Sequence, residues 1–253
     1  MTIKFPIFDA HFHIIDSHYP LISNQGYLPP EFTVAQYLQK TKRLRLFGGA
    51  VVSGSFQGYD QSYLLAALKA LGSSFVGVTQ LPHTVSDQAL FILNQMGIRA
   101  VRFNLKRGGS EDVRNLSSMA KRIYELLDWH TELYIDSSEL PNLYNTLLSL
   151  PKISIDHLGL SHTGFKTLLK LAEKGVKIKA SGFGRVDFDI ATALQDIYKA
   201  NPNALMFGTD LPSTRAPNPF KFKDINLIVQ VLGEDAAQRV LYHNAADFYK
   251  TSE

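Results

Sequence analysis

Short apolar runs alternate with longer amphipathic stretches along the whole chain. The short runs have the length of buried strands and occur at residues 5–13, 48–54, 75–79, 98–103, 133–136, 153–157, 176–181 and 204–210. Apolar residues recur three or four positions apart in the stretches between them. This spacing predicts helices at 33–45, 61–71, 87–96, 111–129, 139–150, 161–174 and 187–201, and two more at 223–232 and 235–250. Strands that alternate with helices in this way favour parallel pairing.

Eight strand-then-helix units in 253 residues predict one domain, a (β/α)8 TIM barrel that spans residues 1–253. No change of composition and no low-complexity linker divides the chain. The long segment 14–32 after the first strand is rich in turn-forming residues, and loops of this length are often functional lids. An open, doubly wound sheet is the alternative. It would call for a glycine-rich fingerprint after the first strand, which the sequence lacks.

Histidines and carboxylates collect where the predicted strands end. His11 and His13 lie two positions apart on the first strand, so their side chains point to the same side. His157 ends the sixth strand and Asp210 ends the eighth. In a barrel these ends share one rim, where active sites lie. Taken singly, each residue also suits a structural role, but together the three imidazoles and one carboxylate match the ligands of one zinc or similar cation.

Basic residues at the same strand ends indicate an anionic ligand. Arg102 lies in the fourth strand, Lys106 and Arg107 in the loop after it, and Arg185 after the seventh strand. Because a guanidinium binds a carboxylate through two parallel hydrogen bonds, these residues favour a carboxylate-bearing substrate. The alternative for Lys106 and Arg107 is a solvated loop.

Composition narrows the function classes. The chain has no cysteine, which excludes disulfides, thiolate catalysis and zinc fingers. A net charge of +3 gives no support for nucleic acid as a partner. No apolar stretch reaches membrane-span length and the first residues lack a signal-type core, so we expect a cytoplasmic protein. Its expected partner is a small anionic substrate rather than nucleic acid or membrane, with the chain acting as a monomer or homodimer.

Several motifs resemble one enzyme superfamily. Asp9-Ala-His-Phe-His13 and Gly208-Thr-Asp210-Leu-Pro212 are similar to strand motifs of the amidohydrolase superfamily. Three further segments resemble its 2-pyrone-4,6-dicarboxylate lactonase branch, of the amidohydrolase-2 type: Val101-Arg-Phe-Asn-Leu105, Ile155-Asp-His-Leu-Gly159 and Asn244-Ala-Ala-Asp-Phe-Tyr249.

The resemblance implies a hydrolase that opens a lactone or related ester of a small carboxylated substrate. It assigns Asp210 as the base that activates water, and it assigns His157, His11 and His13 to polarise the carbonyl. Arg102, Arg107 and Arg185 would hold carboxylates, with Ser53 and Tyr27 as further hydrogen-bond donors. If a metal is bound, its ligands would be His11, His13, His157 and Asp210.

The resemblance is compatible with one divalent cation such as zinc and equally with metal-free catalysis, which occurs in the lactonase branch. The predicted fifth strand ends without histidine or lysine, which argues against a two-metal centre. The loop after Arg102 is one residue shorter than the family pattern, so Lys106 and Arg107 compete for one role. Two other functions stay open: a metal-dependent amidase or decarboxylase acting on a carboxylated ring, and a non-catalytic carboxylate-binding barrel.

Overall fold

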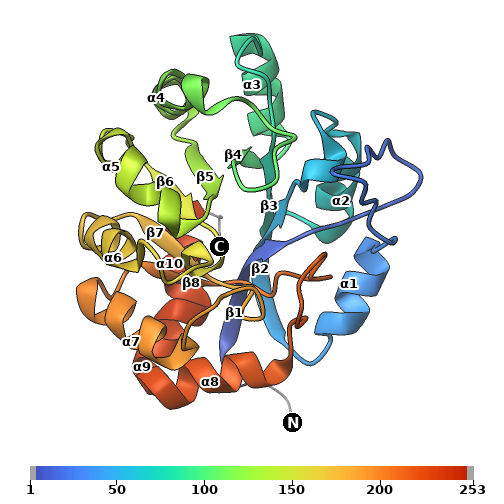
Figure 1. The fold of residues 1–253 in the computed structure, drawn as a ribbon. Helices are drawn as coiled ribbons and strands as arrows, with labels where there is room; N and C mark the ends of the chain where they lie inside the picture. Colours follow the sequence, from blue (N-terminus) through green and yellow to red (C-terminus); the bar gives the residue numbers. More distant parts are fainter. Residues whose placement is uncertain (1–3, 250–253) are drawn as a thin grey trace.

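The fold is a parallel (β/α)8 barrel, as the sequence predicts (Figure 1). The computed structural model describes residues 4–249. Eight strands pair in chain order in one sheet, and each parallel neighbour follows the previous strand. The strands are β1 Pro6–Phe12, β2 Arg45–Val52, β3 Phe75–Thr79, β4 Ile98–Asn104, β5 His130–Tyr134, β6 Ile153–Ile155, β7 Lys177–Ala180 and β8 Leu205–Phe207.

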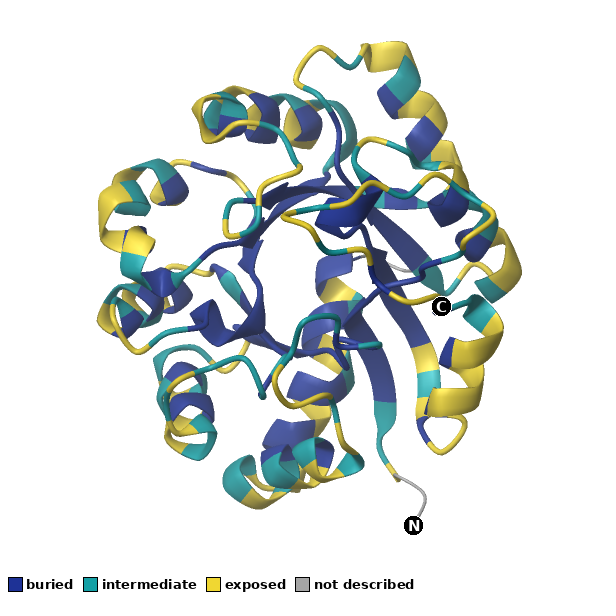
Figure 2. Ribbon diagram, turned by 45° about the vertical axis from the view of Figure 1, so that its right-hand side comes forward, coloured by how far each residue is buried: buried dark blue, intermediate teal, exposed yellow. Residues whose placement is uncertain are grey.

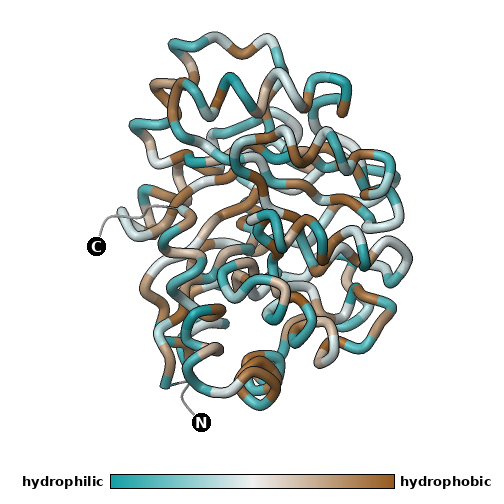
Figure 3. The backbone as a smooth tube through the Cα atoms, turned by 90° about the vertical axis from the view of Figure 1, so that its left-hand side faces the viewer, coloured by the Kyte–Doolittle hydropathy of each residue, from teal (hydrophilic) through white to brown (hydrophobic). Residues whose placement is uncertain are grey.

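Amphipathic helices surround the strands. They are α1 Val34–Thr41, α2 Ser62–Leu71, α3 Asp87–Gln95, α4 Leu116–Leu127, α5 Leu140–Leu148, α6 Phe165–Glu173, α7 Ile190–Ala200, α8 Phe222–Leu232, α9 Glu234–Gln238 and α10 Asn244–Tyr249. A π-helical stretch, Arg239–His243, joins the last two. Figure 2 shows buried strands in the centre and helices whose outer faces are exposed. In Figure 3 hydrophobic and hydrophilic positions alternate along these helices, which is the pattern that predicted them. No helix within residues 4–249 is long and apolar enough to cross a membrane.

Local sequence sets several helix starts. Thr33 caps α1 by accepting a hydrogen bond from the Gln36 amide, and the Gln36 side chain accepts one from the Thr33 amide. Ser86 caps α3 through the Ala89 amide. Gln61 holds the cap position of α2, and the preceding residue, Asp60, accepts a hydrogen bond from the Ser62 hydroxyl.

Some element boundaries differ from those expected. Arg45, expected in the first helix, begins β2. The fifth strand runs over His130–Tyr134 rather than 133–136, because Asp128 adopts a left-handed φ of 55° and ends α4 two residues before the strand. Polar His130 and Glu132 face other buried polar groups inside the barrel, so the apolar pattern marked this strand poorly.

Hydrogen bonds at the carboxyl end join the first and last strands. The His13 amide donates to the Leu211 carbonyl at 2.7 Å, and the Asp210 amide donates to the His11 carbonyl at 2.7 Å. Below them, Asp9 accepts hydrogen bonds from the Thr209 amide and hydroxyl. Gly208 allows this approach, since a Cβ there would lie 2.8 Å from the His11 amide nitrogen. Closure of the barrel thus brings Asp210 beside His11.

The core has two parts. The larger fills the space between strands and helices. The smaller lies inside the barrel, where Phe8, Val52, Val78 and Met206 pack with Tyr249. Charged side chains occupy the barrel interior above this smaller cluster, at the level of Glu132, Asp156 and Lys179. An interior that carries paired charges in place of apolar layers marks the carboxyl half of the barrel as the place to look for chemistry.

Candidate active site

A cavity of about 40 Å³ opens at the carboxyl ends of the strands. Its wall includes His13, Tyr27, Phe56, Arg102, Asn104, Arg107, Tyr134, His157, Arg185 and Arg215. The loop 14–32 lies against this wall, since the Ile22 amide donates to the Phe56 carbonyl at 2.7 Å and the Asn24 side chain donates to the Arg107 carbonyl at 3.2 Å. The loop therefore forms part of the cavity wall, to which it contributes Tyr27.

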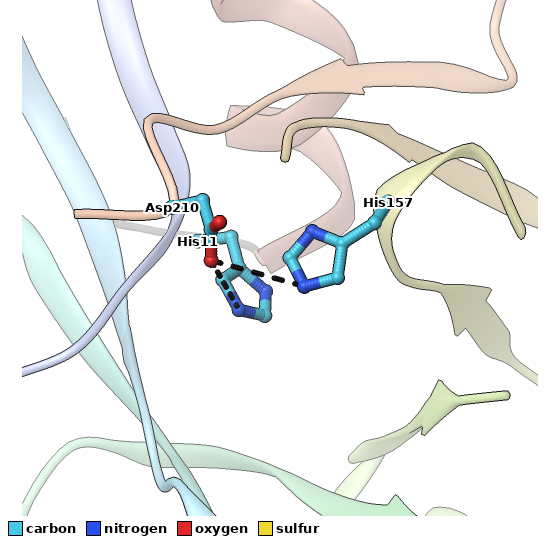
Figure 4. Close-up of side chains that lie close together, drawn as sticks. All are labelled: His11, His157 and Asp210. Carbon is cyan, nitrogen blue, oxygen red and sulfur yellow. Dashed lines mark ion pairs between the residues drawn. The ribbon is translucent and has the colours of Figure 1, made fainter. Parts of the chain in front are cut away.

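Three of the predicted residues, His11, His157 and Asp210, lie close together (Figure 4), and His157 also lines the cavity. Asp210 Oδ1 lies 4.0 Å from His11 Nε2 and 3.8 Å from His157 Nε2. All three side chains are buried. Among residues 4–249, His11 Nε2 and Asp210 Oδ1 have no hydrogen-bond partner. Buried polar atoms are seldom left so, which indicates that a ligand or water completes this group.

His13 lies beside this group without joining it. Its ring is 5.0 Å from that of His11, and its Nδ1 donates to the Val52 carbonyl at 2.7 Å. Of the four expected ligand residues, three have ligand atoms within 4.8 Å of one another in the described part of the chain. The fourth, His13, lies on the cavity wall. Burial lowers the pKa values of His11, His13 and His157, so all three are neutral near pH 7.

Two of the predicted arginines are ion-paired inside the protein. Arg185 Nε donates to Asp210 Oδ2 at 2.7 Å, and its Nη2 donates to the Thr214 carbonyl at 2.8 Å. Arg102 donates to Asp156 Oδ2 at 2.7 and 3.2 Å, and its Nη1 donates to the Ser53 carbonyl. Both side chains reach the cavity wall, but a carboxylate already neutralises each charge.

The structure separates the two cations that compete in the loop after β4. Lys106 lies in a neighbouring groove and pairs with Asp136 at 2.7 Å, whereas Arg107 lines the cavity. Tyr27 also lines the cavity, with Arg215 4.4 Å above its ring. Ser53 does not line it. Its hydroxyl is buried and hydrogen-bonded to the Tyr63 hydroxyl at 2.6 Å, so the expectation that Ser53 faces a ligand does not match its position.

Sequence reasoning missed four charged residues near the cavity. Arg215 lies in a loop without a recognisable pattern. Asp156 directly precedes His157, and this position at the same strand end could have identified it. Lys179 alternates with apolar neighbours on a predicted strand, and the alternation resembled an ordinary strand with one solvated face. In a barrel that face points inward. Glu132 was missed because the fifth strand was expected to begin only at residue 133.

The group formed by His11, His157 and Asp210 fits one divalent cation. Its ligand atoms lie within 4.8 Å of one another, and two imidazoles with one carboxylate suit zinc. The two unpartnered buried atoms, His11 Nε2 and Asp210 Oδ1, are the ones that a metal would engage.

Two known hydrolases are similar in sequence to this chain. A 2-pyrone-4,6-dicarboxylate hydrolase of Comamonas testosteroni is 30% identical over 156 residues, which is 60% of this chain and 51% of that protein. The match therefore spans about half of that relative. A 4-sulfomuconolactone hydrolase of Hydrogenophaga intermedia is 24% identical over 267 residues, covering 95% of this chain and 88% of that protein.

A solved structure has the same fold. It is named as a probable 2-pyrone-4,6-dicarboxylic acid hydrolase of Acinetobacter baumannii, with a TM-score of 0.84, 23% identity and coverage of 96% of this chain and 99% of that one. The amidohydrolase family model matches residues 8–251, which include β1 from Phe8 onward, all of β2 to β8 and all the site residues described above. The chain therefore belongs to the amidohydrolase family and is an enzyme of the hydrolase type.

Proposed function

We propose that this enzyme opens a lactone or related ester of a small carboxylated substrate, such as a pyrone dicarboxylate, by attack of water that Asp210 activates. One observation carries the proposal. Asp210 Oδ1 is buried, unpartnered within residues 4–249 and directed between His11 and His157, while Arg185 holds Oδ2. A carboxylate fixed through one oxygen and open through the other suits a general base.

In the proposed reaction Asp210 takes a proton from water as the water oxygen attacks the ester carbonyl carbon. The carbon–oxygen bond of the ring then breaks, and Asp210 returns the proton to the leaving oxygen. A positioned general base contributes about 10²–10⁴-fold. His157, held by a 2.9 Å hydrogen bond between Nδ1 and the Ser181 hydroxyl, would stabilise the developing oxyanion together with His11.

Metal-free and metal-assisted forms of the site are both proposed. A divalent cation held by His11, His157 and Asp210 would supply a more acidic bound water. The positions of Arg185 and the histidines serve water activation and oxyanion stabilisation in either form.

The cavity wall supports an anionic substrate. Arg102 and Arg185 are neutralised by buried carboxylates, but Arg107 and Arg215 have no carboxylate partner among the residues of the structure's described range, 4–249. Both side chains line the cavity, and burial together with the charge of Arg107 lowers the pKa of Arg215. Two unpaired cations in one wall favour an anion between them. The names of the relatives specify a dicarboxylate and a sulfomuconolactone, both anionic lactones.

A screen of carboxylated lactones tests the proposal. Hydrolysis of 2-pyrone-4,6-dicarboxylate and related lactones would be monitored by the loss of ring absorbance, with and without a chelator. The corresponding cyclic amides would be assayed in parallel. We expect the carboxylated lactones to be hydrolysed, and we expect the same lactones with their carboxylates esterified, and therefore uncharged, to react poorly. Turnover of the amides alone, abolished by chelator, would favour a metal-dependent amidase. Release of carbon dioxide would favour a decarboxylase, and binding without turnover would favour a carboxylate-binding protein.

A further inference from the structure

A second set of cation-binding side chains lies deeper in the barrel than the His11–His157–Asp210 group. It consists of His11 from β1, Glu132 from β5 and Asp156 after β6. One ligand atom from each lies within 4.8 Å of the others, and all three side chains are fully buried. Asp156 Oδ1 has no hydrogen-bond partner among residues 4–249. By donor chemistry this set would suit a divalent cation.

The ammonium of Lys179, from β7, fills the centre of this deep set. Lys179 Nζ forms an ion pair with Glu132 Oε2, and it lies 3.4 Å from Asp156 Oδ1 and 3.3 Å from His11 Nδ1. The ammonium donates a hydrogen bond to Glu132 Oε2 and forms an ion pair with Asp156 Oδ1, so it faces two carboxylates as well as His11 Nδ1. Lysine is almost never fully buried unless it is paired, yet Lys179 has no exposed surface. Lys179 therefore takes the position that a bound cation would need.

The surrounding groups balance this charge. Glu132 also accepts a hydrogen bond from the Tyr249 hydroxyl and lies 3.1 Å from His130 Nε2, and Arg102 donates to Asp156 Oδ2. Two buried carboxylates thus face two buried cations, Lys179 and Arg102. A dication added here would meet both positive charges in a poorly screened interior, where repulsion is strong.

We propose that the Lys179 ammonium is the resident cation of the deep set. It limits the barrel to at most one metal ion per chain, in the His11–His157–Asp210 group, and its removal opens a second site for a divalent cation such as zinc. The ligands for that site would be Glu132, Asp156 and His11 Nδ1. Because His11 Nε2 belongs to the first group, the His11 ring would lose its proton to solvent and bridge the two ions as an imidazolate. This inference concerns metal capacity and does not depend on which ester or amide the enzyme hydrolyses.

Zinc stoichiometry tests the proposal without any activity assay. The purified full chain is stripped with chelator, titrated with zinc in competition with a chromophoric chelator, and melted with and without zinc. Three variants are compared with the wild type: Lys179→Ala, Lys179→Ala with Glu132→Gln, and Lys177→Ala. Lys177 is the matched control, because it lies on the same strand and donates to the Asn203 carbonyl, away from the deep set.

We expect the wild type and Lys177→Ala to bind at most one zinc per chain. Lys179→Ala should bind one more than the wild type and gain a zinc-dependent rise in Tm, and adding Glu132→Gln should abolish the extra ion. If Lys179→Ala unfolds in metal-free buffer, zinc should restore folding. Two zinc ions in the wild type would overturn the proposal. So would a folded Lys179→Ala without an additional zinc, or a Lys179→Ala chain that zinc fails to refold.

Discussion

Removing Arg107 or Arg215 should weaken the enzyme for anionic substrates in a defined way. Replacement by methionine removes the guanidinium and keeps most of the apolar stem. A hydrogen bond to a charged group contributes about 1.5–3 kcal/mol, and about 1.4 kcal/mol corresponds to a tenfold change. We therefore expect Arg107→Met to lower kcat/KM by about 10- to 100-fold. Arg107 is the cleaner site, since its hydrogen bonds with residues 4–249 involve only its backbone, whereas the Arg215 guanidinium contacts Asn24 and Tyr27.

Steady-state kinetics on a carboxylated lactone would measure the effect. The loss should appear mainly as a higher KM, because both arginines lie on the cavity wall and not in the Asp210 group. The double variant should lose less than the product of the single losses, since both groups would bind the same anion. Arg114→Met is the control. Arg114 is exposed, pairs with Asp112 and lies outside the cavity wall.

Two results would refute this reasoning. An Arg107→Met enzyme with unchanged kcat/KM would show that the guanidinium does not bind substrate. A loss confined to kcat with unchanged KM would show that Arg107 acts in the chemical step, and it would contradict the proposed role of Arg107 in substrate binding.

Two further predictions concern the buried histidines. Burial lowers the pKa values of four of them, so they take up protons more readily after unfolding: His11, His13, His130 and His157. The free energy of unfolding should therefore be greatest above about pH 6.5 and should decrease as the pH falls below it, by up to about 1.4 kcal/mol per pH unit for each histidine. Burial raises the pKa of Asp9 to about 6, so the folded protein gains one proton at Asp9 as the pH falls, and this offsets the contribution of one histidine. Urea unfolding at several pH values measures this free energy. A free energy of unfolding that stays constant or rises as the pH is lowered to 5.5 would contradict the prediction. Gly182→Ala should lower kcat strongly, because the new Cβ would lie 2.6 Å from His157 Nδ1. Gly175→Ala is the control: its φ of 96° is also unfavourable for alanine, but no described atom lies within 4 Å of the new Cβ, so kcat should stay unchanged. Equal kcat values for the two variants would argue against a catalytic role that depends on the position of His157.

Much of the fold follows from the sequence because barrel strands and helices have different apolar periods. β3 was predicted with its observed bounds, since all five residues are apolar or small and turn-forming residues flank it. β5 was misplaced because His130 and Glu132 point into a charged interior. Periodicity reports burial against apolar groups and cannot identify a buried polar partner from a distant strand.

The convergence of His11, His157 and Asp210 was predictable because strand ends share one rim. The pairing of charges was not. Arg102 and Arg185 were expected to bind substrate, but each meets a buried carboxylate whose distance depends on strand register and loop conformation. Arg215 was missed because its loop after β8 has no periodic pattern. The roles of these residues in catalysis and binding remain predictions.

Asp210→Asn tests the central proposal most directly. Asparagine keeps the shape of the side chain and an oxygen that can still accept the hydrogen bond from Arg185, but it cannot take a proton from water. With a carboxylated lactone that the wild type opens, kcat should fall by about 10²–10⁴-fold, while calorimetry should show the anionic product binding nearly as well as to the wild type. An Asp210→Asn enzyme that turns over at close to the wild-type rate would contradict Asp210 as the base that activates water.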